Sequence, residues 1–177
     1  VPVIGVIFRG GKFLDGALKT EVTVDGIDAT EKIINLINST RHKKQLKIIM
    51  FDGVTLAGFN IVDIKKLYEE KEYLTVKKRA LKKLYEHTNL PVIIINRKIP
   101  NLKKVKNALK NFKDFERRWK MILNAGEIKE CEIKENKKVY YQSIGLSEEE
   151  TEEVINLSTT RSFIPEPLRV AHLIATA

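Results

Sequence analysis

Three side chains that lie far apart in the chain could take part in chemistry: Asp28, Asp52 and His172. Asp52 follows the apolar run 46–51 and precedes Gly53. In open α/β sheets, ligands bind beyond the carboxyl ends of the strands, so a carboxylate there can face a ligand while its backbone stays in the sheet. The alternative is a turn aspartate, because Asp-Gly is a common turn pair.

The other two residues each have a structural alternative. Asp28 lies three residues before Glu31, which is the spacing of a capping box and predicts Asp28 as the N-cap of a helix. Such a cap can still leave one carboxylate oxygen free for a metal ion. His172 lies in a predicted helix beside Val170 and Leu173, so it is either a ligand or a hydrogen-bonded residue of the core or its edge.

Several catalytic classes are excluded by what the chain lacks. It has no glycine-rich phosphate-binding loop and no G-x-S-x-G nucleophile elbow. Its one cysteine, Cys131, lies in the acidic segment IKECEIKE, where negative neighbours raise a thiol pKa. Metal-assisted chemistry by Asp and His is the class that stays open.

The basic residues are concentrated in the middle of the chain. Residues 64–125 carry 18 basic and 6 acidic side chains, which is a net charge of +12. The whole chain has a net charge of +9, so the rest of it is slightly negative. A polyanion is the natural partner of such a region. Arg97 and Lys98 follow the apolar segment 92–95, and Lys103 and Lys104 open the next helical pattern. The alternative is a solvated surface, since Lys and Glu enrichment is also typical of heat-adapted proteins.

The patterns of the chain predict an α/β domain with a mixed sheet, spanning 1–177 as a single domain. A hairpin is expected over 1–9 and 17–24, and further strands over 46–51, 92–95, 128–133 and 138–142. Helices are expected after Asp28, over 61–70, over 101–124, after the capping box that Ser147 opens, and over 168–176. Within 101–124, Arg117 and Arg118 could contact nucleic acid, whereas Trp119 falls on the apolar stripe and is expected in the core.

Nothing in the chain indicates a membrane protein or export, so a cytoplasmic location is expected. The chain also opens directly in a predicted strand, from which we expect a preceding segment to be missing from the sequence given.

Several segments together resemble an archaeal family related to endonuclease V, known as domain of unknown function 99 and as endonuclease dU. They are IIMFDGVTLAGFNIVDI, LPVIIINRK, VYYQSIGLS and IPEPLRVAHLIATA. The resemblance covers nearly the whole chain, and PEPLRVAHLIA is its most specific part. It implies an RNase H-like fold and cleavage of a phosphodiester near a deaminated base, uracil or hypoxanthine, with Mg²⁺ or Mn²⁺ as cofactor.

The resemblance also implies roles for particular residues. Asp52 corresponds to the acid at the end of the central strand, Asp28 to the acid that opens the first helix, and His172 to a polar residue near the metals. Arg97 and Lys98 correspond to basic residues that approach the backbone of DNA, the expected partner, with RNA left open.

The chain departs from the family pattern in four places. The strand with the principal acid would precede residue 1, the aromatic-proline wedge is replaced by VTVDGIDAT, and Val54 stands where endonuclease V has a histidine. Residues 69–86 look like a helical insertion. The sequence therefore leaves two functions open, a metal-dependent endonuclease of DNA repair and a non-catalytic nucleic-acid-binding protein on a degenerate RNase H-like scaffold.

Overall fold

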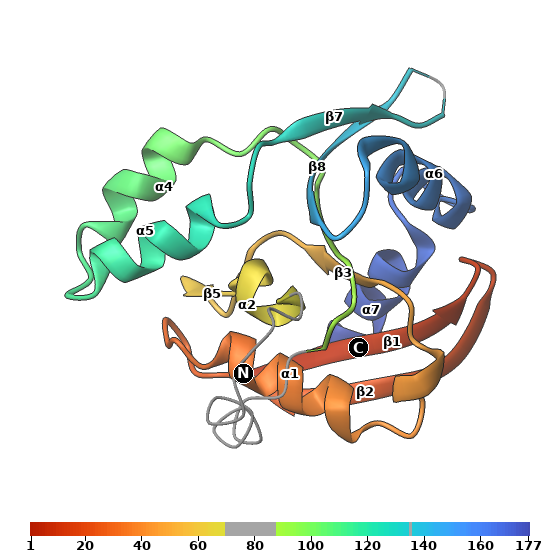
Figure 1. The fold of residues 1–177 in the computed structure, drawn as a ribbon, viewed down its shortest axis with the longest axis horizontal. Helices are drawn as coiled ribbons and strands as arrows, with labels where there is room; N and C mark the ends of the chain where they lie inside the picture. The colour runs from red at the N-terminus through yellow and green to blue at the C-terminus, as the bar shows by residue number, and fades with distance from the viewer. Residues whose placement is uncertain (70–87, 135) are drawn as a thin grey trace, which may run out of the picture.

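The computed structural model describes residues 1–69, 88–134 and 136–177, and it has a mixed α/β fold in which helices flank a four-stranded sheet (Figure 1). The strands are β1 (Pro2–Arg9), β2 (Phe13–Glu21), β3 (Ile49–Asp52), β4 (Thr55–Leu56), β5 (Asn60–Ile61), β6 (Val92–Asn96), β7 (Lys129–Glu132) and β8 (Lys138–Ile144). The helices are α1 (Ala29–Ser39), α2 (Ile64–Tyr68), α4 (Leu102–Leu109), α5 (Phe115–Leu123), α6 (Glu148–Ser158) and α7 (Glu166–Ala175), with a short 3₁₀ turn at Lys43–Gln45. The predicted insertion over 69–86 falls, apart from Glu69, outside the described residues.

The four-stranded sheet has the order β3-β6-β8-β7. β3 runs parallel to β6, whereas β6 with β8 and β8 with β7 are antiparallel. β1 and β2 form a separate antiparallel hairpin, and β4 pairs with β5 in a minimal one. The mixed sheet predicted from the sequence is therefore confirmed, and β3 with β6 end at the same edge.

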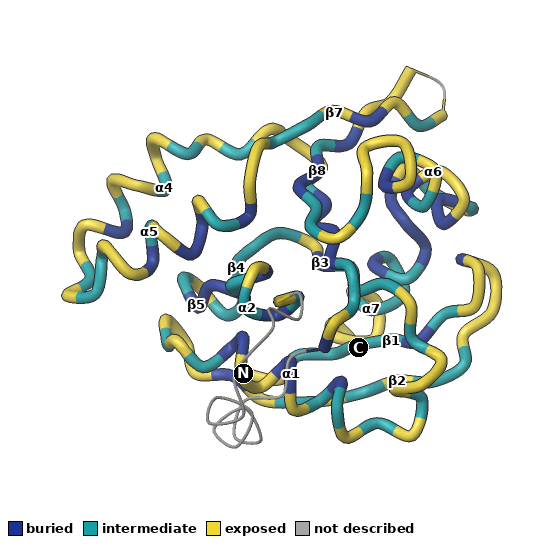
Figure 2. Tube along the Cα trace, viewed as in Figure 1, coloured by how far each residue is buried: buried dark blue, intermediate teal, exposed yellow. Residues whose placement is uncertain are grey.

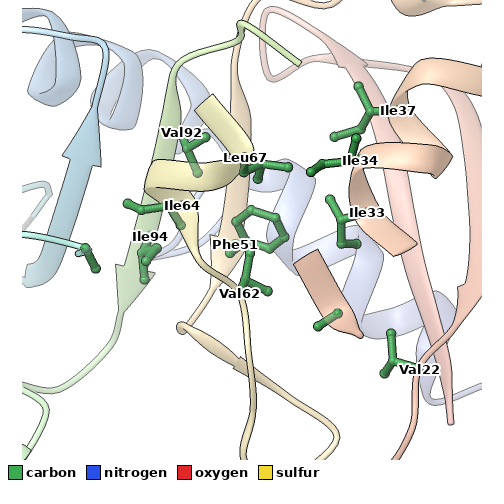
Figure 3. Close-up of a cluster of buried hydrophobic side chains, with 12 residues drawn as sticks. Val22, Ile33, Ile34, Ile37, Phe51, Val62, Ile64, Leu67, Val92 and Ile94 are labelled. Atoms are coloured by element: carbon green, nitrogen blue, oxygen red, sulfur yellow. The ribbon is translucent and has the colours of Figure 1, made fainter. Parts of the chain in front are cut away.

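β6 lies at the centre of the fold because both of its faces are covered. Val92 and Ile94 point into one apolar cluster, together with Phe51 of β3 and the apolar stripes of α1 and α2 (Figure 3). Ile93 and Ile95 point into a second cluster formed with β7, β8, α6 and α7. All four side chains are buried, and burial of each contributes about 1.5–3 kcal/mol. The continuous apolar run of β6 is thus what a strand between two helical layers requires.

The long helix predicted over 101–124 is wrong, because the chain turns back on itself after Lys110. α4 ends at Leu109 and α5 begins at Phe115, so the two helices lie side by side as a hairpin (Figure 1). Leu109, Met121 and Ile122 then bury against Ile61 in a third apolar cluster. A single straight helix would leave half of that apolar stripe in water.

Most other predicted elements are present with shifted ends. Ser147 forms the predicted capping box with Glu150 and starts α6, and Pro167 lies in the first turn of α7. β2 begins at Phe13, four residues earlier than the alternation of the sequence predicts. α7 packs against both β1 and β3, which fixes the C-terminal helix beside the sheet. In the described part of the chain, no helix is long and apolar enough to cross a membrane.

Candidate functional site at the carboxyl edge of the sheet

Asp52 lies at the carboxyl end of β3, where the sequence places it. In the parallel pairing of β3 with β6, Asp52 is opposite Ile95, and the Gly53 amide donates a hydrogen bond to the Ile95 carbonyl at 2.9 Å. Arg97 follows β6 directly, so it emerges at the same edge as Asp52. The prediction that Arg97 and Asp52 share one edge of a parallel pair is confirmed.

The Asp52 carboxylate stays open to solvent despite this neighbour. Nη2 of Arg97 lies 4.0 Å from Oδ2 of Asp52, and the two side chains are 58% and 46% exposed. An exposed ion pair at that distance contributes at most about 1 kcal/mol. The pair is therefore loose enough for either group to exchange its partner for a ligand.

Arg97 also lines a cavity of about 530 Å³ between the sheet and α7. Most of its polar lining is cationic, and Phe163 supplies an aromatic ring. The lining residues are Arg97, Lys137, Lys138, Val139, Ser162, Phe163, Ile164, Arg169, His172 and Leu173. His172 thus faces the same cavity as Arg97, and Arg97 connects that cavity to Asp52.

Two of the cations in this cavity are held by acids. Arg169 donates hydrogen bonds to both carboxylate oxygens of Glu166, at 2.6 and 2.8 Å, and Lys138 pairs with Glu130. The hydrogen bonds from Arg169 lower the pKa of Glu166, whose side chain is only 4% exposed. Lys137 lies over the Phe163 ring at 5.7 Å. The cavity therefore keeps a positive balance, with Arg97 and Lys137 least neutralised.

His172 is exposed on α7 and is not a core residue. The position of His172 at the cavity is set by the packing of α7. This helix contacts β1 and β3, and its Leu168 is buried in the second apolar cluster. An exposed imidazole on a fixed helix can hold or move a proton for a molecule in the cavity.

Asp28 does not cap α1, so the predicted capping box is wrong. It occupies the N-cap position, but its side chain makes no capping hydrogen bond. Asn60 takes that role instead, because its Oδ1 accepts a hydrogen bond from the Ala29 amide at 3.0 Å. No pattern in the sequence indicates Asn60, which is fully buried on a strand too short to be recognised.

The Asp28 carboxylate is held in a polar network instead. It accepts hydrogen bonds from Asn60 Nδ2 at 2.6 Å, from the Thr23 amide at 3.2 Å and from the Thr23 hydroxyl at 3.1 Å. Burial alone would raise the pKa of Asp28, but the hydrogen bonds from Asn60 and Thr23 outweigh it and lower the pKa. Asp28 is therefore an anion held by Thr23 and Asn60 just before the first helix.

The structure thus brings together only part of the predicted site. Asp52 and His172 are connected through Arg97, whereas Asp28 contacts Thr23 and Asn60 and does not line the cavity. Among residues 1–69, 88–134 and 136–177, no three or more His, Cys, Asp and Glu side chains form a group that could hold a metal ion. At this edge Asp52 is the carboxylate that could serve as a ligand, and Mg²⁺ is an ion that needs only one or two carboxylates because it keeps several waters.

The predicted nucleic-acid contacts lie on the surface next to this edge. Arg97 and Lys98 are exposed in the loop after β6, and Lys103 and Lys104 are exposed in the first turn of α4. Trp119 packs against the third apolar cluster as predicted. The suggested contact by Arg118 is wrong, because this side chain is buried and hydrogen-bonded within the protein.

A comparison with family models gives one match that covers nearly the whole chain. The model described as Endonuclease dU matches residues 1–76 and 80–177. The matched residues include every side chain of the site described above.

Similar proteins come from several archaea. A UPF0215 protein of Methanosarcina mazei is 45% identical over 99% of this chain and 82% of its own length. A UPF0215 protein of Methanothermobacter thermautotrophicus is 45% identical over 99% of this chain and 78% of its own length. A crystal structure of a protein of unknown function from Archaeoglobus fulgidus has a TM-score of 0.76 at 30% identity and covers 99% of this chain and 95% of that one.

Proposed function

We propose that this chain, which belongs to the endonuclease dU family, is a metal-dependent endonuclease that cleaves a phosphodiester near a deaminated base in DNA. One observation carries the proposal: an open carboxylate, Asp52, meets Arg97 at the carboxyl edge of the sheet, beside a cationic cavity. We also take the β3–β6 pair and its flanking helices to be part of an RNase H-like fold. The family's name supports a nuclease, and the geometry supplies groups suited to one.

Asp52 would hold the cation, with Mg²⁺ and Mn²⁺ as the candidates. The resemblance implies Asp28 as a second carboxylate, although its hydrogen bonds go to Thr23 and Asn60 and it does not line the cavity. A divalent ion, when bound, stabilises charge on the attacking and leaving oxygens and lowers the pKa of a bound water. Only one or two carboxylates are needed, because Mg²⁺ retains waters and takes phosphate oxygens of the substrate as further ligands. Asp52 is 46% exposed, which leaves its carboxylate accessible to such an ion.

The basic residues would hold the substrate. Arg97 and Lys98 follow β6 and would bind the phosphates on either side of the scissile bond, with Lys103 and Lys104 reaching phosphates further along. Release of Arg97 from its 4.0 Å contact with Asp52 costs little, so a phosphate can replace the carboxylate as its partner. His172 would hold or pass a proton at the cavity wall.

The substrate we favour is DNA that contains uracil or hypoxanthine, in a role in DNA repair. The damaged base would leave the stack in order to be read, at a cost of a few kcal/mol that is lower for a mismatched base. A nicking assay with the full-length protein and Mg²⁺ tests this, using duplexes that differ only in one uracil, one inosine or no lesion. We expect cuts in a damaged duplex only; intact protein that cuts none of the three would contradict the proposal.

A non-catalytic nucleic-acid-binding protein is the second candidate. It is favoured by one observation, that the described residues do not gather three metal-ligating side chains. It predicts tight, salt-dependent binding of nucleic acid with no cleavage in Mg²⁺ or Mn²⁺. Binding and nicking measured on the same damaged duplex distinguish the two functions.

A further inference from the structure

The α4–α5 hairpin, residues 101–124, carries a dense positive charge on its outer side. This segment contains eight basic and two acidic residues. Seven of the basic side chains are exposed: Lys103, Lys104, Lys106, Lys110, Lys113, Arg117 and Lys120. Figure 2 shows exposed positions of both helices interrupted by intermediate or buried ones, as expected for a hairpin with one face on the protein.

These seven cations are largely unpaired within the protein as far as it is described, although the charge of Arg117 helps to lower the pKa of Asp114. None of them forms a salt bridge in residues 1–69, 88–134 and 136–177. Asp114, one of the two acids of the hairpin, is already paired with the buried Arg118 at 2.7 Å. The outer side of the hairpin is therefore available to a polyanion.

The aromatic side chains of the hairpin pack against the protein, and Leu123, at the end of α5, is its one large apolar side chain that is exposed. Phe112, Phe115 and Trp119 pack against the third apolar cluster. Phe112 makes an edge-to-face contact with Phe59, with ring centroids 5.6 Å apart, and Lys106 lies over the Trp119 ring at 5.1 Å. Proteins that bind single-stranded nucleic acid stack its bases on accessible aromatic rings. Helices that bind membranes expose an apolar face. Because the rings of the hairpin pack inward and a single large apolar side chain, Leu123, is exposed, the outer side is suited to neither role and is dominated by positive charge.

Arg118 fixes the hairpin to the rest of the protein. Its guanidinium donates hydrogen bonds to the carbonyls of Asp25 at 2.8 Å, Gly26 at 3.0 Å and Phe59 at 2.7 Å. Asp25 and Gly26 lie just before Asp28, and Lys98 lies four residues before α4 begins at Leu102. The hairpin is thus attached rigidly, at one side to the turn before Asp28 and at the other to the loop that carries Arg97.

We infer that the outer side of the α4–α5 hairpin binds the phosphate backbone of double-stranded nucleic acid, as a continuation of the Arg97–Lys98 surface. The inference rests on the proposed function, because it takes nucleic acid to be the substrate, and it adds the substrate's strandedness. α4 has eight residues and is about 12 Å long, which corresponds to three or four base pairs at about 3.4 Å each. Backbone contacts over that distance hold a duplex without reading its sequence.

The test measures binding of a duplex and of its single strand as a function of NaCl, with all proteins in an Asp52→Asn background so that nothing is cut. The hairpin variant combines Lys110→Gln, Lys113→Gln and Arg117→Gln. The control removes the same charge elsewhere, with Lys12→Gln, Lys19→Gln and Lys32→Gln, all exposed on the β1–β2 hairpin and α1. Equal melting temperatures of the two triple variants exclude a folding defect.

We expect the hairpin variant to lose at least tenfold in duplex affinity at low salt. The slope of log K against log [NaCl] should fall in magnitude by about 2 to 3, since each lost phosphate contact removes about 0.9. The control should keep the slope of the Asp52→Asn parent, and both the single strand and vesicles of anionic lipid should bind more weakly than the duplex. A hairpin variant with the parent slope, or equal binding of the single strand or the vesicles, overturns the inference.

Failure of this inference and failure of the proposed function give different results. If the wild type cuts no damaged duplex but the hairpin variant loses slope, the binding surface stands and the nuclease proposal fails. If the wild type cuts and the hairpin variant keeps the parent slope, the nuclease stands and the binding surface is wrong.

Discussion

Nδ2 of Asn60 lies 2.6 Å from Oδ1 of Asp28, while Oδ1 of Asn60 caps the first helix through the Ala29 amide. One buried amide therefore performs two tasks, since it starts α1 and sets the direction of the Asp28 carboxylate. Nδ2 of Asn60 also donates to the Thr23 carbonyl at 2.8 Å, which completes its hydrogen bonding. Asp28 is consequently held by its neighbours rather than by the helix that it precedes.

Asn60→Ala should destabilise the protein by about 1–3 kcal/mol, because it leaves the buried Ala29 amide without its partner and removes one of the two hydrogen bonds to the Thr23 carbonyl, which keeps the bond from the Gly26 amide. Urea unfolding measures the effect. Asn111→Ala, at an exposed position between α4 and α5, is the control and should change stability by less than about 0.5 kcal/mol. Equal stabilities for the two variants would show that Asn60 does not hold this network.

Arg118→Met should lower the free energy of unfolding by about 2–4 kcal/mol, since it removes hydrogen bonds to three backbone carbonyls and the salt bridge to Asp114. Arg117→Met changes the neighbouring, exposed residue of the same helix and should be nearly neutral. Thermal unfolding compares the two variants. The anchoring role of Arg118 is refuted if both melt at the temperature of the wild type.

Glu166 should make stability depend on pH in the acid range. The hydrogen bonds from Arg169 lower its pKa below the ordinary value of 4.5, so the unfolded state binds the proton more readily. The stabilisation by ionised Glu166 is therefore complete above the unfolded pKa and is lost as pH falls through the lower folded pKa. Glu166→Gln should be less stable than the wild type near pH 7, and the difference should shrink in acid. A difference that grows on acidification would contradict this assignment.

Cys131 should be inert in the folded protein. Its thiol is buried, and burial together with the charge of Glu152 raises its pKa to about 11. Since the chain has one cysteine, the reaction with a disulfide reagent reports this site alone. At about pH 8 the native protein should react at least a hundredfold more slowly than the urea-unfolded chain, because the thiolate is the reactive form. Equal rates in the two states would be inconsistent with the buried position of Cys131.

The positions of Asp52 and Arg97 at the sheet edge could be predicted from the sequence, whereas the buried contacts of Asn60 and Arg118 could not. Asp52 and Arg97 could be placed together because each follows a short apolar strand, and parallel strands end at one edge. The break between α4 and α5 could not be predicted, since the apolar spacing of three and four continues through it and only the shared contact with Ile61 decides the turn. The contacts of Asn60 and Arg118 span 31 to 93 residues in the chain, so no local pattern encodes them. The pair of Arg169 with Glu166, three residues apart on a helix, was a readable signal that the sequence analysis missed.

Asp52 is the carboxylate on which the proposed cleavage reaction depends most. Single-turnover cleavage of a uracil- or inosine-containing duplex in Mg²⁺ should be compared for the wild type, Asp52→Asn and Asp15→Asn. Asp15 also pairs with an arginine, Arg9, but lies on the β1–β2 hairpin and serves as the matched control. We predict that Asp52→Asn lowers the rate at least about a thousandfold while still binding the duplex, and that Asp15→Asn cuts at the wild-type rate. An Asp52→Asn protein that cuts as fast as the wild type would show that Asp52 has no part in cleavage.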